Sequence, residues 1–158
     1  MPQIVTTTDL ISALETACAT RARDKAIVEA LHVEFLGRPT APDLQDIARR
    51  LLAPGYTTHG GPAGHEVGAE ALVACWRRVG RAVPDFGVEV QDILHSGDRW
   101  IVRSIMFGTP VGRFLGLDPT GRSFSFQAIH THRVLDGLVA ETWHVDDMAG
   151  AARQLLGR

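Results

Sequence analysis

The stretch "QAIHTHRVLDGLVAETWHVDD", from Gln127 to Asp147, carries three of the chain's seven histidines around an Asp136-Gly137 pair. An Asp-Gly pair between alternating apolar residues is typical of a β-hairpin. Two adjacent aspartates close the stretch, whereas the rest of the chain spreads its ionisable groups thinly. We therefore predict an antiparallel hairpin, one face of which carries the chemistry of the protein.

A second pair of runs with period two precedes this hairpin. The runs "FGVEVQDILHSGD" and "RWIVRSIMFGTP" predict two strands joined at Ser96-Gly97-Asp98, a sequence typical of a tight turn. The last residues, "DMAGAARQLLGR", predict a short helical tail. The C-terminal half of the chain is thus expected to form the sheet.

Helical spacing dominates the residues before Pro84. Ile27, Leu31 and Phe35 recur at four-residue steps, and Gly37 with Pro39 is expected to end that helix. A short helix is predicted from about Asp43 to Pro54-Gly55, and another over residues 68–82. Residues 1–23 are expected to form an additional N-terminal helix, separated by a break near residues 21–24.

The order of these elements predicts the fold class. Helices followed by antiparallel strands indicate an α+β protein, with a curved sheet packed against about three N-terminal helices. A curved sheet closed on one side by helices forms a cone with an apolar interior, which suits a small-molecule pocket. Neither a repeat nor an interdomain linker interrupts the chain, so residues 1–158 are expected to form a single domain.

Composition and charge argue against several classes of binding partner and of cellular location. The net charge is -2 and no Lys/Arg-rich run is present, which argues against a nucleic-acid binder. Cys18 and Cys75 have no metal-ligand or disulfide spacing, as expected in a reducing cytoplasm. The first twenty residues lack a basic region and a long apolar run, so neither a signal peptide nor a membrane span is predicted.

A longer motif connects the two predicted hairpins. The run "VGRFLGLDPTGRSFSF", from Val111 to Phe126, resembles the G-x-x-x-G-x-x-P-T-G signature of SnoaL-like polyketide cyclases, which belong to the nuclear-transport-factor-2-like superfamily. The resemblance extends from about Asp24 to Gly157. It implies a cofactor-free enzyme that closes a ring in a hydrophobic, carbonyl-rich polyketide intermediate. It also implies a homodimer or homotetramer.

The resemblance implies two catalytic positions. A histidine of the family's penultimate strand corresponds to His130, and the acid/base aspartate of the last strand corresponds to His144. The family's later aspartate matches Asp147, whereas Asp146 has no clear counterpart. Imidazole can take and return a proton near neutral pH. We therefore expect His144 to be the acid/base and His130 to position it or polarise a substrate carbonyl.

The register of the hairpin decides whether these two histidines share a face. A two-residue Asp136-Gly137 loop with regular strands would set His130 opposite Trp143 and send His144 to the other face. A three-residue loop that includes Leu138, with a bulge, would set His130 opposite His144. The apolar pattern is compatible with both registers, and the resemblance favours the second.

Several other residues are candidates for substrate contacts. The run "GYTTHGGPAGHE" is expected to be a loop at the pocket mouth, His32 to be a partly buried helix residue, and His65 and His95 to be exposed. Large aromatic residues of such a cone serve as both core and pocket wall. The predicted substrate-binding residues are His132, Tyr56, His59, Trp76, Phe107, Phe114, Phe126 and Asp146.

Two alternatives remain beside a cofactor-free cyclase. His130, His132 and His144 on one face would supply three nitrogens, the ligand number of a catalytic zinc, although the resembled cyclases use no metal and none is predicted here. The same fold also serves as a non-catalytic binding or assembly module, or hosts hydrolysis, oxygenation or pyran formation in the same pocket. Histidines gathered inside the pocket favour an enzyme, because holding an apolar ligand does not require buried ionisable groups.

Overall fold

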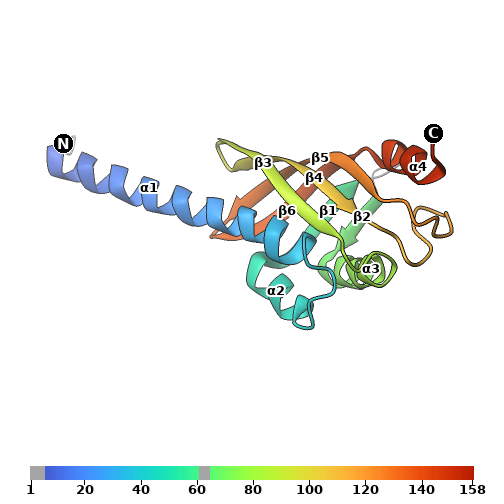
Figure 1. Cartoon of the computed structure of the whole chain (residues 1–158). Coiled ribbons are helices and arrows are strands. Elements are labelled where there is room, and N and C mark those ends of the chain that lie inside the picture. The colour runs from blue at the N-terminus through green and yellow to red at the C-terminus, as the bar shows by residue number, and fades with distance from the viewer. Residues whose placement is uncertain (1–5, 61–64) are drawn as a thin grey trace.

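The computed structural model describes residues 6–60 and 65–158. One mixed sheet of six strands follows the order β2-β1-β6-β5-β4-β3 (Figure 1). The helical elements are α1 Thr7–Ala30, the π-helix η1 Leu31–Leu36, α2 Leu44–Leu51, α3 Ala69–Ala82 and α4 Met148–Leu156. The strands are β1 Leu52–Gly60, β2 His65–Gly68, β3 Gly87–Ser96, β4 Arg99–Gly108, β5 Phe124–Leu135 and β6 Leu138–Asp146. The predicted α+β class is confirmed.

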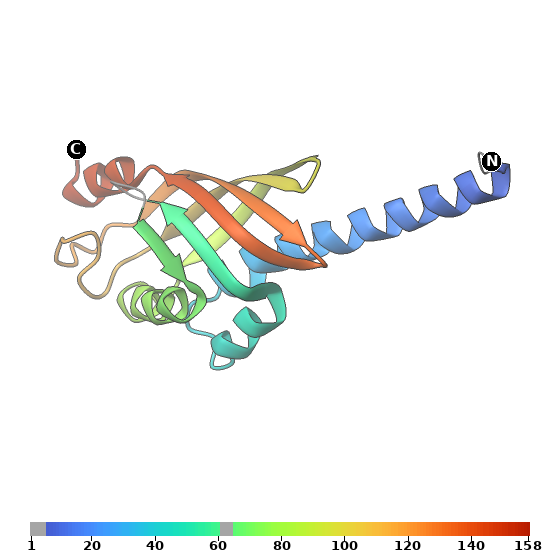
Figure 2. The same ribbon diagram turned by 180° about the vertical axis from the view of Figure 1, so that it is seen from behind.

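The sheet has one buried face and one more open face. Strands pair antiparallel throughout except β1 and β6, which run parallel. Burial alternates along β5 from Phe124 onward, so its even-numbered residues face inward. Helices α2 and α3 lie together on one side of the sheet (Figures 1 and 2). The main core lies between the buried sheet face and these helices.

The N-terminal helix is longer and straighter than predicted. Thr6 caps α1 in a capping box with Asp9, and the helix continues through residues 21–24 without the expected break. Most of α1 extends away from the rest of the molecule (Figure 2). It passes directly into η1, where His32 is fully buried rather than partly buried. No helix among the described residues is both long enough and apolar enough to cross a membrane.

Strand β1 corrects two of the sequence predictions. Helix α2 ends at Leu51, and Pro54-Gly55 lies inside β1 instead of ending a helix. The ladder to β6 is irregular between Leu52 and Thr57, and Gly55 has a φ of 77°. Proline and glycine are tolerated in a strand at such a bulge, because the missing N–H and the positive φ are accommodated there. The expected loop 55–66 is a β1–β2 pair in its described part, and residues 61–64 lie outside the described residues.

The β5–β6 hairpin brings His130 opposite His144, as the resemblance favoured. The predicted three-residue loop is wrong. Leu135 pairs with Leu138, and Asp136 and Gly137 both have positive φ, which is the two-residue turn that an Asp-Gly pair favours. The extra residue is Ala140, which lies as a bulge between the Val139 and Glu141 pairings. The bulge shifts the register, so that His130 and His144 lie on the same face.

Candidate active site

A cavity of about 490 Å³ lies between the inner face of the sheet and the helices. Its walls are mainly apolar and aromatic. Most of its polar side chains gather where β5 and β6 meet, and Arg78 of α3 is a further, charged lining residue. This size and this lining are typical of small-molecule sites. The lining residues include Leu31, Leu36, Tyr56, Val67, Leu72, Trp76, Val79, Phe86, Met106, Phe114, Phe126, His130, His132, Thr142, His144 and Asp146.

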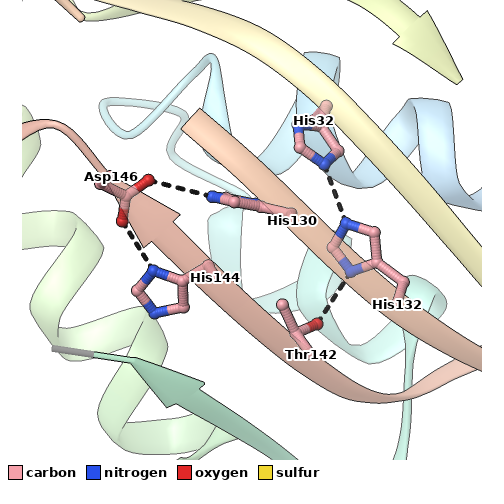
Figure 3. Close-up of polar contacts among 6 residues, drawn as sticks. All are labelled: His32, His130, His132, Thr142, His144 and Asp146. Carbon is pink, nitrogen blue, oxygen red and sulfur yellow. Dashed lines mark hydrogen bonds and ion pairs between the residues drawn. The ribbon is translucent and has the colours of Figure 1, made fainter. Parts of the chain in front are cut away.

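Asp146 joins the two histidines that the sequence predicted to be catalytic. Its Oδ2 lies 2.6 Å from His144 Nδ1, and its Oδ1 lies 3.2 Å from His130 Nε2 (Figure 3). The Asp146 side chain is only 9% exposed, whereas that of His144 is 28% exposed. Asp146 therefore bridges the two histidines, and His144 is the most exposed of the three side chains.

The charge of Asp146 follows from its surroundings. Burial raises the pKa of its carboxyl group, but hydrogen bonds from His130 and His144, with the attraction of both rings, outweigh burial and leave the pKa below its usual range. An ionised carboxylate only accepts hydrogen bonds, so each imidazole donates one N–H to it. His144 then carries its proton on Nδ1, and its Nε2 has a free lone pair.

A second chain of hydrogen bonds joins His32, His132 and Thr142. His32 Nε2 lies 2.9 Å from His132 Nε2, and His132 Nδ1 lies 2.9 Å from Thr142 Oγ1 (Figure 3). Burial lowers the pKa of His32 to about 3, with a further contribution from His130, and burial also lowers that of His132 well below its usual value. Both rings are therefore neutral near pH 7.

Sequence reasoning did not assign His32 to the site, although a signal existed. His32 follows Leu31 in a stripe of buried residues that continues with Phe35 and Leu36. A histidine on the buried stripe of a helix needs polar partners inside the protein. The sequence predicts Asp146 only as a substrate contact, because the resembled family has no clear counterpart for it. Its bridging position was not predicted.

Most of the predicted pocket residues line the cavity, but two do not. Tyr56, Trp76, Phe114, Phe126 and His132 are among its walls. His59 lies on the other face, where it stacks on Trp143 and its Nε2 lies 2.8 Å from Glu141 Oε1. Phe107 is 42% exposed, next to inward-facing Met106 on β4. The predicted pocket positions of His59 and Phe107 are wrong, because alternation along each strand turns these side chains outward.

Two groups of side chains bring potential metal ligands together. One ring nitrogen from each of His32, His130 and His132 lies within 4.8 Å of the others, and the same holds for ligand atoms of His130, His144 and Asp146. The trio of His130, His132 and His144 considered from the sequence is not one of these convergent groups, because His132 turns toward His32 and Thr142.

Fold and site together define a class of protein. The mixed sheet and the helices enclose an apolar cavity that suits a small molecule. The carboxylate and the histidines at one end of this cavity are groups that can transfer protons. The chain belongs to the SnoaL-like polyketide cyclase family, whose model matches residues 26–155. The resemblance of the sequence to this family is thereby confirmed.

Individual relatives are similar over different lengths. Nogalonic acid methyl ester cyclase of Streptomyces nogalater is 37% identical over 51 residues, which span 32% of this chain and 38% of that enzyme. The structure of wild-type IdmH from Streptomyces antibioticus has a TM-score of 0.72 and 28% identity, covering 85% of this chain and 99% of that one. TsrD from Streptomyces laurentii has a TM-score of 0.67 and 30% identity, covering 87% and 95%.

Proposed function

We propose that the protein is a polyketide cyclase that closes a ring in a hydrophobic, carbonyl-rich intermediate by acid/base catalysis, without a cofactor. The observation that carries this proposal is the Asp146 carboxylate, which bridges His144 and His130 at the polar end of the cavity. Family membership supports a cyclase role. The arrangement supplies a base, a residue that orients it and an apolar chamber for the substrate.

The proton transfer proceeds through His144. With Nδ1–H donated to Asp146, His144 Nε2 takes a proton from a carbon activated by neighbouring carbonyl groups. The resulting enolate carbon forms a bond to a carbonyl carbon of the same molecule, and the electron pair of that carbonyl moves to its oxygen. The imidazolium returns its proton to this oxygen. Atoms and charge balance without an external oxidant, reductant or metal.

His130 acts through the same carboxylate. It donates Nε2–H to Asp146 Oδ1, which holds the carboxylate in place while the other oxygen accepts from His144. Asp146 thus sets the His144 tautomer and stabilises the imidazolium that forms during turnover. His130 also lines the cavity, so its ring forms part of the wall beside the substrate.

The apolar walls hold the substrate in its reactive shape. Tyr56, Trp76, Phe114 and Phe126 offer mainly ring surface, with few groups that could bind a charged ligand. Folding a flexible chain of carbonyls so that the enolate meets its electrophile supplies much of the acceleration, because it converts an improbable encounter into a bound geometry. The substrate class is therefore a hydrophobic polyketide with several carbonyl groups.

A direct assay tests this function. Nogalonic acid methyl ester, named by the similar cyclase, is the first substrate to incubate with the protein, followed by other aromatic polyketide esters. An aldol addition within one molecule leaves the mass unchanged, so the product is an isomer with a new chromatographic retention time and a new absorption spectrum. Formation with native protein but not with the His144→Ala variant supports the proposal. Ligands that bind tightly and are recovered unchanged would show a binding module instead.

We further propose that the protein is a homo-oligomer. The outward face of the sheet carries apolar side chains that are largely exposed in the single chain, among them Leu94, Phe107, Ile129 and Val145. Several exposed apolar side chains on one sheet face, with Ile129 and Val145 directly paired, are typical of an interface. Light scattering coupled to size-exclusion chromatography tests this, and a molar mass near 17.1 kDa at micromolar concentration would contradict it.

A further inference from the structure

His32, His130 and His132 form a group of side chains that is buried more deeply than His144 and Asp146. His32 and His132 are fully buried and His130 is 5% exposed. They come from two elements, η1 and β5, and one ring nitrogen from each lies within 4.8 Å of the others. Figure 3 shows His130 between the His32–His132 pair and the Asp146–His144 pair.

Hydrogen bonding within the protein leaves this group incompletely satisfied. His130 gives Nε2–H to Asp146, and its buried Nδ1 has no partner among the described residues. The Nε2 atoms of His32 and His132 share one hydrogen bond, and the buried Nδ1 of His32 likewise has no partner in the part of the chain that the structure describes. Buried polar atoms without partners are rare in native proteins, and a bound ion is one of their regular explanations, which here applies to His130 Nδ1.

The outer contacts of the three rings resemble those of metal ligands. Histidines that bind a metal usually donate their second N–H to a carboxylate or another acceptor, which fixes the tautomer and the ring orientation. His130 has Asp146 in this position, and His132 has Thr142 Oγ1 at 2.9 Å from Nδ1. The nitrogens that remain are His130 Nδ1 and His132 Nε2, and His32 offers Nε2 beside the latter.

The helix geometry around His32 also indicates a functional site at this group of histidines. His32 lies in a π-helical segment, Leu31–Leu36, at the end of an α-helix. Such segments are rare and frequently mark functional sites, because the wider turn re-aims a side chain. Here the segment places the His32 ring against His132, a residue 100 positions later in the chain.

We propose that His32, His130 and His132 bind a divalent transition-metal ion, with zinc as the natural choice for neutral imidazole ligands. Zn–N bonds of about 2.0–2.1 Å in a tetrahedral arrangement separate two nitrogens by about 3.3 Å. The 2.9 Å between His32 Nε2 and His132 Nε2 therefore opens by a few tenths of an ångström, and the proton between them moves to His32 Nδ1, so that both rings bind the ion as neutral imidazoles. The fourth position is taken by water.

This proposal is independent of the proposed cyclase activity. The ion joins η1 to β5, and His130 keeps its Nε2–H bond to Asp146 while Nδ1 binds the metal. The alternative group of His130, His144 and Asp146 is the weaker candidate, because the Asp146 oxygens and His144 Nδ1 already satisfy one another at hydrogen-bond distance. The expected role is therefore to stabilise the junction between helix and sheet.

Calorimetric titration of tag-free, chelator-treated protein with Zn²⁺ tests the site. We expect one equivalent of Zn²⁺ to bind and to raise the melting temperature. His32→Phe should weaken binding at least about tenfold, because the loss of even an outer contact of a metal ligand costs about 10- to 100-fold. The exposed His95 provides a matched control, and His95→Phe should bind as the native protein does. His144→Ala should also retain binding, which distinguishes the two groups.

Cobalt substitution of the native protein covers the case in which a His32 variant fails to fold. Bound Co²⁺ should show visible absorption bands of a nitrogen- and oxygen-ligated tetrahedral ion, and X-ray absorption should count three imidazoles. The proposal is overturned by the absence of saturable Zn²⁺ binding, by unchanged affinity in folded His32→Phe, or by loss of binding in His144→Ala. A thiolate-to-cobalt band would also overturn it, since it would assign the ion to Cys75 of the cavity wall.

Discussion

Gly60 lies against the imidazole ring of His144, so closely that a Cβ atom at position 60 would overlap Nε2, Cε1 and Cδ2 of that ring. Gly60 is the last residue of β1, and His144 projects from the neighbouring strand β6. The ring that we assign as the base therefore occupies space that only glycine leaves open. Its orientation depends on β1 as well as on Asp146.

Replacing Gly60 with alanine should move the His144 ring and break its bond to Asp146. A displacement of about 1 Å at a reacting group can cost about 100-fold in rate, so we expect a loss of that order in kcat with the fold retained. Gly68→Ala is the matched control, because the nearest atom to its new Cβ is Tyr56 O at 3.8 Å. Circular dichroism checks folding, and native-like turnover of Gly60→Ala would show that the ring position is not critical.

Asp146→Asn should lower the free energy of unfolding at neutral pH by about 1.5–3 kcal/mol, the usual range for hydrogen bonds to a charged group. The pKa of the Asp146 carboxyl is depressed in the folded protein, so its stabilisation is complete above the unfolded value of about 3.9 and is lost as pH falls further. The stability difference between the native and variant proteins should therefore begin to shrink as pH falls below about 4, and should continue to shrink at lower pH. Urea unfolding at several pH values measures this, with exposed Asp118→Asn as control.

The buried His32 should make stability depend on pH in a different range. Its pKa is about 3 in the folded protein, against about 6.5 in an unfolded chain. The unfolded chain therefore binds an additional proton as pH falls below about 6.5, and stability decreases by up to about 1.4 kcal/mol per pH unit for this one group. His32→Phe should reduce that slope between pH 6 and about 4 in metal-free protein, whereas the exposed His65→Phe should leave it unchanged. Equal slopes would contradict the buried, neutral state of His32.

The site also shows which features the sequence could predict. That His130 and His144 share a face could be predicted from the family resemblance alone, because the apolar pattern is compatible with both registers of the hairpin. The Ala140 bulge that makes this possible could not be located, since an extra residue can be absorbed at several points of a hairpin. His59 and Phe107 were misplaced for the same reason: their direction depends on register, which composition does not encode.

Contacts between residues far apart in the sequence are even harder to predict from the sequence. Pro54-Gly55 indicated the end of a helix, yet it forms a bulge within β1, because pairing with β2 and β6 outweighs the local preference. His32 was expected to be a partly buried helix residue, but a π-helical segment places it against His132. Neither a helical period nor a motif specifies such a segment. The deep burial of His32, His130 and His132 is therefore a property of the folded structure that the sequence pattern does not predict.

Removal of metal ions should leave turnover intact. The proposed proton transfer uses only His144 and Asp146, so chelator-treated protein should convert substrate at nearly the native rate. Bound Zn²⁺ should affect the melting temperature rather than the chemistry. Activity that disappears on chelation and returns with one added metal would overturn the cofactor-free mechanism, and would assign a catalytic role to the ion held by His130 and its neighbours.

Substitution of His144 gives the most direct test of the mechanism. His144→Ala removes the group that takes and returns the proton, and a positioned acid/base group is worth roughly 100- to 10,000-fold in rate. We expect a loss of that size in kcat, with the fold and substrate affinity largely unchanged, since the apolar walls remain. An inactive variant that no longer binds substrate would indicate a role in binding instead.

His144→Asp completes this test, because it separates the chemistry from the particular side chain. A carboxylate can perform the same proton transfer when an apolar pocket raises its pKa, so the variant should retain measurable turnover above that of His144→Ala. Because carboxylates lose their proton at lower pH than imidazoles, the acid limb of the pH–rate profile should move to lower pH in this variant. Rescue by aspartate together with a displaced limb would identify position 144 as the base. Native-like turnover of His144→Ala would exclude it, and would transfer the role to His130, His132 or Asp146, or to the pocket walls alone.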